Sequence, residues 1–388
     1  MVSKKAKVYV GMSGGVDSSV SAALLLEQGY DVTGVFIKVW QPDFIECTWK
    51  EDRLDAMRVA AQLGIPFVTL DLEKEYKQGV IDYMIEEYRI GRTPNPDVMC
   101  NREVKFGAFW RWAKEQGADY IATGHYATIQ KKYPAGVVAE PHDKTHRTSM
   151  YGSSSRFSAP SHQNNFSKSL HLGVSKDANK DQTYFLWTLT CDDLEHVLFP
   201  IGYMEKDDVR KEAEKRSLYT SSKKDSQGLC FIGTIDLKTL LKEYIKQETG
   251  DVINQAGEII GSHEGVMFYT IGERHGFTIT KKSTDDAPYY VIGKDLEKNL
   301  LIISHSKPHT EKSQEIVLEK ISFVNEVPQK ETTYSARGRY RAPLAKVKIV
   351  EDNNVWKVQV LEGELIHTSG QSLVLYDDTK CIGGGIMK

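Results

Sequence analysis

The chain has 388 residues, of which 40% are hydrophobic and 27% charged, and its formal net charge at pH 7 is −3. This length exceeds one ordinary hydrophobic core, so two or three domains are expected, and the composition is typical of a soluble globular protein. No apolar run approaches the roughly 20 residues of a membrane helix, and with so small a net charge a nucleic-acid partner would have to bind to local basic patches.

The N-terminus and the cysteines indicate the compartment. The basic residues 1–7 run directly into an apolar segment and leave no room for a signal or transit peptide, so we expect a cytoplasmic protein without membrane contact. The cysteines are odd in number and scattered, which argues against a secreted disulfide scaffold and a C-x-x-C zinc site. They are Cys47, Cys100, Cys191, Cys230 and Cys381.

The first predicted element is a short buried strand over 8–10, followed by Gly-Met-Ser-Gly-Gly-Val-Asp-Ser at 11–18 and then by a helix that ends at Gly29. Free N–H groups and the positive end of the helix make such a turn an anion site, and Gly14 and Gly15 let a phosphate approach the backbone. It is not a Walker loop, because no lysine follows the glycines. A plain tight turn is the alternative, but it does not explain two adjacent glycines among serines.

Strands and helices alternate through the first half of the chain. Strands are predicted over 32–40, 66–72 and 120–124, and helices over 53–63, 73–90 and 106–115, with Gly64, Gly91 and Gly117 at the helix ends. The alternation predicts an α/β fold with a doubly wound parallel sheet, which binds ligands at the carboxyl ends of its strands. The turn at 11–18 and the segment Thr-Gly-His-Tyr at 123–126 both leave their strands at that edge.

The second half has a different texture. Residues 131–176 are rich in Ser and His and predict a flexible surface insertion, whose histidine spacing matches no metal motif. Charged helices are predicted over 206–217 and 235–249. From residue 250, short strands and turns predict a small β-barrel or sandwich. We expect an α/β domain over 1–205, a small central domain over 206–285 and a C-terminal β-barrel over 286–388. The strands are predicted at 251–253, 258–261, 289–293, 300–304, 345–350, 355–360, 372–376 and 383–386.

Two cysteines lie in settings that suit reactive thiols. The proline-stiffened loop at 93–101 presents Asp97 and Cys100 with basic residues close behind; cations favour a thiolate, and a carboxylate can move a proton. The alternative is that Cys100 is a packed thiol at the start of the next helix. Cys230 follows a polar run with two lysines, which can expose a thiol, although a buried cysteine at a strand start fits equally well. Cys47, Cys191 and Cys381 are predicted to be structural.

A basic strip lies on the predicted barrel. Arg-Gly-Arg-Tyr-Arg at 337–341, with Lys346 and Lys348, interleaves arginine with tyrosine, which suits phosphate contact and base stacking. A solvated strand face is the alternative.

The ordered set of motifs resembles the tRNA-specific 2-thiouridylases (MnmA-type enzymes), a branch of the ATP pyrophosphatases with an adenine nucleotide alpha hydrolase-like fold. The matching segments run along nearly the whole chain. They are GMSGGVDS at 11–18, NPDVMCN at 95–101, TGHYA at 123–127, KDQTYFL at 180–186, DSQGLCFIG at 225–233, YTIGERHG at 269–276 and RYR at 339–341. The segment between Tyr126 and Lys180 is longer than usual for the family.

The resemblance implies roles for individual residues. Cys100 matches the catalytic nucleophile, Cys230 the persulfide carrier, and Asp97 a proton-transfer group that meets the target base. The residues implied to bind ATP are Gly11, Met12, Ser13, Gly14, Gly15, Val16, Asp17, Ser18, Ile37 and Gly124, and those implied to contact the base or the tRNA are Asn95, Pro96, Asp97, Lys180, Asp181, Gln182, Arg339 and Tyr340.

The implied reaction adenylates the C2 oxygen of wobble uridine with ATP and Mg²⁺, and then replaces that oxygen with sulfur to give 2-thiouridine. The implied partners are the anticodon arms of tRNA-Lys, tRNA-Glu and tRNA-Gln and an upstream persulfide carrier. Either sulfide release or direct persulfide attack fits, and both leave a Cys100–Cys230 disulfide. The alternatives are an ATP pyrophosphatase that adds nitrogen, and a tRNA-binding protein that keeps the fold as a relic.

Overall fold

The computed structural model describes residues 5–44, 49–131, 170–224, 237–280, 287–308, 315–352 and 355–388. A five-stranded, wholly parallel sheet forms its N-terminal part, in the order β3-β2-β1-β4-β7. Its strands are β1 (Lys7–Gly11), β2 (Asp31–Lys38), β3 (Phe67–Asp71), β4 (Tyr120–Ala122) and β7 (Val197–Leu198). The predicted doubly wound parallel sheet is confirmed, since crossover connections pack helices on both faces.

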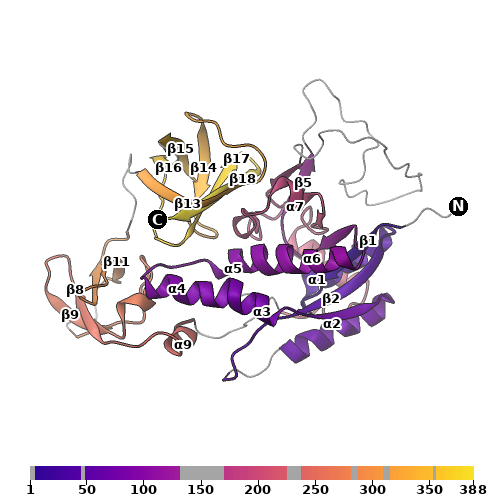
Figure 1. Ribbon diagram of the computed structural model, residues 1–388, viewed down its shortest axis with the longest axis horizontal. Coiled ribbons are helices and arrows are strands. Elements are labelled where there is room, and N and C mark those ends of the chain that lie inside the picture. Colours follow the sequence, from indigo (N-terminus) through magenta and orange to yellow (C-terminus); the bar gives the residue numbers. More distant parts are fainter. Residues whose placement is uncertain are drawn as a thin grey trace.

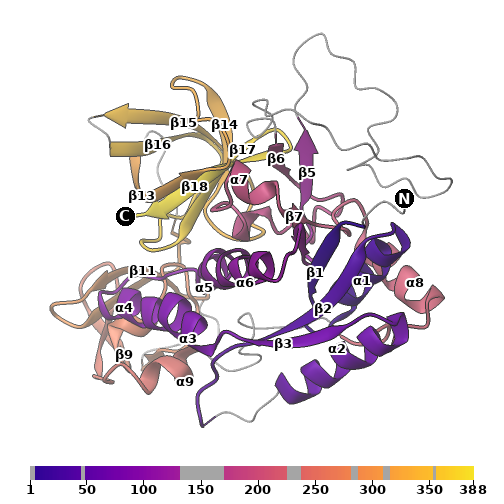
Figure 2. The same ribbon diagram turned by 45° about the vertical axis from the view of Figure 1, so that its right-hand side comes forward.

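Helices α1 (Val16–Glu27), α2 (Trp49–Leu63) and α8 (Lys206–Lys215) pack on this sheet through one apolar cluster. Val20, Leu24 and Val209 are among its buried members. Figure 2 shows α8 beside α1. Gly29, Gly64, Gly91 and Gly117 all adopt positive φ just beyond helix ends, as predicted, because glycine reaches that conformation without strain.

Two long helical segments cross the middle of the molecule and run side by side in Figure 1. One comprises α3 (Glu73–Tyr76), a π-helical stretch (Lys77–Asp82) and α4 (Tyr83–Arg89), and matches the predicted helix over 73–90. The other comprises α5 (Pro96–Met99), a π-helical stretch (Cys100–Ala108) and α6 (Phe109–Glu115). It begins before the predicted start at residue 106, because Pro96 suits a first helical position and Asn95 caps the helix.

The central part is a five-stranded sheet in the order β10-β9-β8-β12-β11. Its strands are β8 (Gly250–Ile253), β9 (Ile259–His263), β10 (Thr278–Ile279), β11 (Tyr290–Asp295) and β12 (Leu300–Ser304). Because β11 and β12 pair within this sheet, a domain boundary at residue 285 would divide it. The preceding helix α9 (Leu237–Lys242) ends well before the predicted residue 249, and a turn follows it.

The C-terminal strands close into a barrel in the order β13-β16-β15-β14-β17-β18, with β18 returning to β13. They are β13 (Glu315–Phe323), β14 (Thr333–Arg337), β15 (Ala345–Asp352), β16 (Val355–Glu362), β17 (Ser372–Asp377) and β18 (Lys380–Met387). The predicted barrel is confirmed, although the sequence patterns did not predict β13 and β14. The hairpin of β5 (Thr128–Lys131) and β6 (Leu170–Gly173) extends the sheet from β18 and ties the barrel to the N-terminal part.

Short elements complete the path: α7 (Cys191–Leu194) and the 3₁₀ turns at Thr183–Phe185 and Val266–Phe268. The end of α4 meets the central sheet, where the Lys294 ammonium donates to the carbonyls of Gly91 at 2.6 Å and Tyr269 at 2.8 Å. Burial lowers the pKa of Lys294 to about 8. Among the described residues, no helix is long and apolar enough to cross a membrane.

Candidate functional site: a glycine loop joined to a cysteine helix

The loop at 11–18 lies between the end of β1 and the first turn of α1. Gly14 has φ +76°, and a Cβ there would come within 2.3 Å of the Asp52 carbonyl oxygen on α2, so glycine is required. Gly15 is the N-cap of α1, and no side chain caps the helix there. The Ser18 hydroxyl instead braces the loop, with the Ser13 N–H 3.2 Å away. The positive end of α1 is therefore presented at the carboxyl edge of the sheet, as an anion site requires.

Asp17 and Ser18 of this loop are packed against the end of β4. A Cβ on Gly124 would lie 2.7 Å from the Ser18 nitrogen and 2.8 Å from the Asp17 carbonyl carbon. Glycine is therefore needed at Gly124 because the segment after β4 touches the first turn of α1 here. Met12, beneath the loop, is buried, and Ile37, at the end of β2, is 5% exposed within the core.

Asp17 is the charged residue of the 11–18 loop, and its carboxylate is paired with a lysine. Its two carboxylate oxygens accept from the Lys206 ammonium at 2.7 and 2.8 Å, and Oδ1 also accepts from the Tyr126 hydroxyl at 2.8 Å. Lys206 comes from the first position of α8, and its side chain is only 10% exposed. The sequence patterns did not single out Lys206 as a site residue, because nothing along the chain links it to the loop.

His125 lies beside the same strand end. Its Nδ1 is 2.7 Å from the Thr123 hydroxyl, and its ring packs against Phe106 and Phe199. Complete burial, reinforced by the Lys105 charge, lowers the pKa of His125 well below its usual value. The imidazole is therefore neutral near pH 7.

The segment that carries Cys100 is a helix start and not the predicted loop. The Asn95 side chain accepts from the Val98 N–H at 3.3 Å, and Pro96 begins the helix. Asp97 and Cys100, three positions apart, therefore share one helix face. The Cys100 side chain is completely buried, as in the packed alternative, while Asp97 is partly exposed.

The 180–186 motif connects the 11–18 loop with the Asn95 helix. Gln182 pairs with Tyr126 twice: its backbone N–H donates to the Tyr126 carbonyl at 2.8 Å, and its Oε1 accepts from the Tyr126 N–H at 2.9 Å. The Phe185 N–H donates to the Gln182 carbonyl at 2.9 Å, and the Phe185 carbonyl accepts from the side chain of Asn101, the neighbour of Cys100. A continuous path of hydrogen bonds thus runs from Asp17 to Asn101.

Asp181 points inward. Its carboxylate accepts from the Ser175 N–H at 3.0 Å and the Thr183 hydroxyl at 2.6 Å, and burial raises its pKa. Lys180 is partly exposed beside it. The side chains of Asp181 and Gln182 thus make intramolecular hydrogen bonds that shape the segment, and the Lys180 N–H donates to Asp177.

The barrel contributes the third side of the site. Tyr340 packs on Phe185 with ring centroids 4.6 Å apart, and the Phe185 carbonyl accepts from the Asn101 side chain at 2.9 Å. The Arg339 guanidinium donates to the Thr368 hydroxyl at 3.0 Å and also reaches the Ile271 carbonyl, so it joins the barrel to the central part. The predicted segments 95–101, 180–186 and 339–341 are thus brought together. Cys230 and Cys47 lie outside the described residues.

Comparison with known proteins agrees with this architecture. Residues 6–234 match the family described as the tRNA methyl transferase HUP domain, residues 238–305 its PRC-barrel domain, and residues 313–387 the aminomethyltransferase beta-barrel domain.

Full-length relatives are also found. The chain is 42% identical to the tRNA-specific 2-thiouridylase MnmA of Streptococcus mutans, over 99% of this chain and 95% of the relative. It is equally 42% identical to the protein of that name from Listeria monocytogenes, over 98% of this chain and 94% of the relative.

Solved structures are more distant. The U34-tRNA thiolase NcsA from Methanococcus maripaludis aligns with 62% of this chain and 64% of its own, at 16% identity and a TM-score of 0.33. A 4-thiouridine synthetase–RNA complex with bound ATP aligns with 59% of this chain and 45% of its own, at 18% identity and a TM-score of 0.33.

Proposed function

The chain belongs to the tRNA-specific 2-thiouridylase family, and from this membership we infer that it is a tRNA-uridine 2-sulfurtransferase that uses ATP to put sulfur at C2 of a tRNA uridine. The observation that supports this most directly is the hydrogen-bond path from Asp17 through Tyr126, Gln182 and Phe185 to Asn101, which adjoins Cys100. It joins an anion site to a cysteine-bearing helix start, as a reaction that first adenylates and then thiolates one base requires.

Adenylation converts the C2 oxygen of uridine, a poor leaving group, into AMP, a good one. The uridine O2 attacks the α-phosphorus of ATP, the bond to the β-phosphate oxygen breaks, and pyrophosphate departs. The α1 N-terminus and the loop glycines would bind the phosphates through backbone N–H groups. Ile37 at the end of β2 would contact the adenine, and Gly124 would line the nucleotide site.

The residues present fit a Mg²⁺ ion held mainly by the phosphates. Asp17 supplies one carboxylate beside the loop, and magnesium in phosphate-transfer sites uses one or two carboxylates plus substrate oxygens. Among the described residues no cluster of three or more such ligands exists, so an all-protein cage is not expected. Bound there, the ion would neutralise phosphate charge; Asp17 would hold it and Tyr126 would orient Asp17.

Sulfur would arrive as a persulfide on Cys230. In one route, the Cys100 thiolate attacks the Cys230 sulfur, hydrosulfide leaves, and hydrosulfide then displaces AMP at C2. In the other, the terminal persulfide sulfur displaces AMP at C2, and Cys100 then attacks the Cys230 sulfur to release 2-thiouridine. Both routes form a Cys100–Cys230 disulfide, which two electrons from cellular thiols must reduce. Asp97, which lies on the same helix face as Cys100, would be the proton-transfer group.

The same proposal covers the partners. Lys180, Arg339 and Tyr340, together with Asn95, Pro96, Asp97, Asp181 and Gln182, would form or shape the surface that receives the anticodon arm of tRNA-Lys, tRNA-Glu or tRNA-Gln at wobble position 34. A persulfide carrier protein would load Cys230 in the cytoplasm. Because the Cys100 side chain is completely buried, tRNA binding must open this part of the site before reaction.

The test is sulfur transfer to unmodified tRNA with ATP, Mg²⁺ and a persulfide source, read as 2-thiouridine by nucleoside mass spectrometry. We expect product from the wild type, and none from Cys100→Ser or Cys230→Ser. Cys191→Ser is the matched control, because Cys191 is also buried but lies against the Leu170 carbonyl. Wild type that consumes ATP in the presence of tRNA without thiolating it would refute the sulfur chemistry; activity in both serine variants would refute the cysteine roles.

A further inference from the structure

We propose that Lys206 is the phosphate-binding cation of the nucleotide site, held ready by Asp17 and transferred to the ATP phosphates when the nucleotide binds. The inference rests on the proposed use of ATP at the loop. The loop sequence carries no lysine after its glycines, unlike a Walker loop. The fold instead brings a lysine to the loop from 189 positions beyond Asp17.

The topology delivers Lys206 to the phosphate edge. Strand β7 runs parallel to β4, so residues after Leu198 leave the sheet at the same edge as the loop after β1. The Lys206 N–H donates to Asp177 at 3.0 Å, and Val209 and Ala213 of α8 are buried in the cluster that also holds α1. The backbone that carries the ammonium is therefore fixed, and only its flexible side chain has to move.

The charge arrangement around the ammonium favours an exchange of partners. Asp17 lies in the first turn of α1, where the helix end itself attracts negative charge. The Lys206 side chain is 10% exposed, whereas that of Asp17 is 31% exposed and can take a metal ion in place of the ammonium. ATP brings several negative charges to the same helix end, and a mostly desolvated ammonium forms strong charge-assisted hydrogen bonds with phosphate oxygens.

A purely structural salt bridge between α8 and α1 makes different predictions. In that case Lys206 never leaves Asp17, and its loss weakens ATP binding only because it exposes the Asp17 charge to the phosphates. Neutralising Asp17 would then remove any further effect of Lys206. In our proposal the opposite holds: neutralising Asp17 releases Lys206 for the phosphates, so the lysine matters most in that background.

The experiment measures equilibrium ATP binding by calorimetry without Mg²⁺ and without tRNA, so that it does not depend on catalysis. The variants are Lys206→Met, Asp17→Asn and the double variant, with Lys211→Met as control because it is an exposed lysine of the same helix. The double variant leaves no unpaired buried charge, which protects its folding. Thermal unfolding of each variant reports whether the fold is kept.

Without Mg²⁺, we expect Asp17→Asn to bind ATP more tightly than wild type, because Lys206 no longer pairs with Asp17, and the double variant to bind at least about tenfold more weakly than Asp17→Asn. Equal affinity of the double variant and Asp17→Asn would overturn the proposal. If the wild type binds ATP and these two variants have the same ATP affinity, only the role of Lys206 is refuted. If the wild type binds no ATP, the proposed function itself is refuted.

Discussion

At the residue scale, the site depends on polar groups whose burial is matched by specific partners. Asp17 is paired with Lys206 and Tyr126, and Asp181 is satisfied by Ser175 and Thr183. Buried polar groups are costly unless hydrogen-bonded, so these contacts fix the shape of both motifs. His125 differs, because burial and the nearby Lys105 charge lower its pKa and so favour the neutral imidazole.

His125 makes stability depend on pH. The pKa of His125 is lowered in the folded protein, so below about pH 6.5 the unfolded chain binds a proton that the folded chain does not. The free energy of unfolding therefore decreases as the pH is lowered. We expect the unfolding free energy of wild type relative to His125→Gln to decrease by about 1 kcal/mol between pH 7.5 and 5.5. Urea unfolding at several pH values measures this, with the exposed His275→Gln as control. A difference that does not change with pH would contradict the neutral buried imidazole.

At the element scale, a barrel loop fixes the position in space of the segment that precedes the Asn95 helix. The Thr93 N–H donates to the Ser369 carbonyl at 2.8 Å, and the Gln371 side chain donates to the Pro94 carbonyl at 3.3 Å. Gly370 lies between these contacts with φ +91°, and a Cβ on it would lie 2.9 Å from three backbone atoms of Thr93. The chain before Asn95 is thus positioned by the C-terminal barrel, far away in sequence.

We therefore expect Gly370→Ala to displace residues 93–95 and to lower both stability and thiolation. The positive φ costs about 1 kcal/mol, and the overlap with Thr93 adds about 1–3 kcal/mol. Gly257→Ala is the matched control, because Gly257 has φ +82° and a Cβ on it would meet no atom within 4 Å, so only the first cost applies. Urea unfolding and kcat/KM for tRNA thiolation distinguish the two variants; equal losses in both would show that the contact with Thr93 is unimportant.

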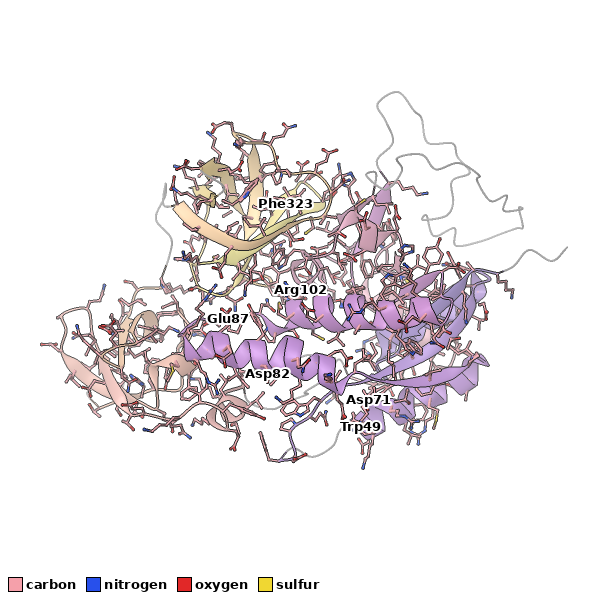
Figure 3. The ribbon with its side chains drawn as sticks, viewed as in Figure 1. Trp49, Asp71, Asp82, Glu87, Arg102 and Phe323 are labelled. Atoms are coloured by element: carbon pink, nitrogen blue, oxygen red, sulfur yellow. The ribbon has the colours of Figure 1, made fainter. Side chains whose placement is uncertain are left out.

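At the scale of the whole molecule, α4 lies between the parallel sheet, the central sheet and the barrel (Figure 1). Figure 3 labels Glu87 on this helix, on the side of the barrel. Its carboxylate lies 3.0 Å from Arg92 Nε and 3.4 Å from Lys320 Nζ, and Arg92 Nη2 reaches Glu319 of β13 at 2.5 Å. The side chains of Glu87 and Arg92 are 9% and 16% exposed, so the centre of this ion-pair network is shielded from water, whereas its barrel members Glu319 and Lys320 are more exposed.

Arg92→Met should loosen that junction. It leaves the buried Glu87 carboxylate with the half-exposed Lys320 as its remaining cation in this network, and removing one partner of a buried ion pair costs about 3 kcal/mol. Arg89→Met is the control, because the Arg89–Glu86 pair is largely exposed and such pairs contribute under about 1 kcal/mol. Urea unfolding measures both losses of stability, and the rate of limited proteolysis reports on barrel docking. Equal stability of the two variants would refute the structural role of this network.

The sequence alone determined the features that depend on neighbouring residues. Strand–turn–helix order and paired glycines predicted the parallel sheet and the 11–18 loop, and glycines predicted helix ends at 29, 64, 91 and 117, because φ and helix periodicity are local properties. Two local features were misread or missed: residues 96–101 form a helix that Asn95 caps and not a loop, and β13 and β14 were not predicted. Only the tertiary structure brought Lys206 to Asp17 and Tyr340 to Phe185, because such contacts depend on strand order and barrel closure, which leave no periodic trace along the chain.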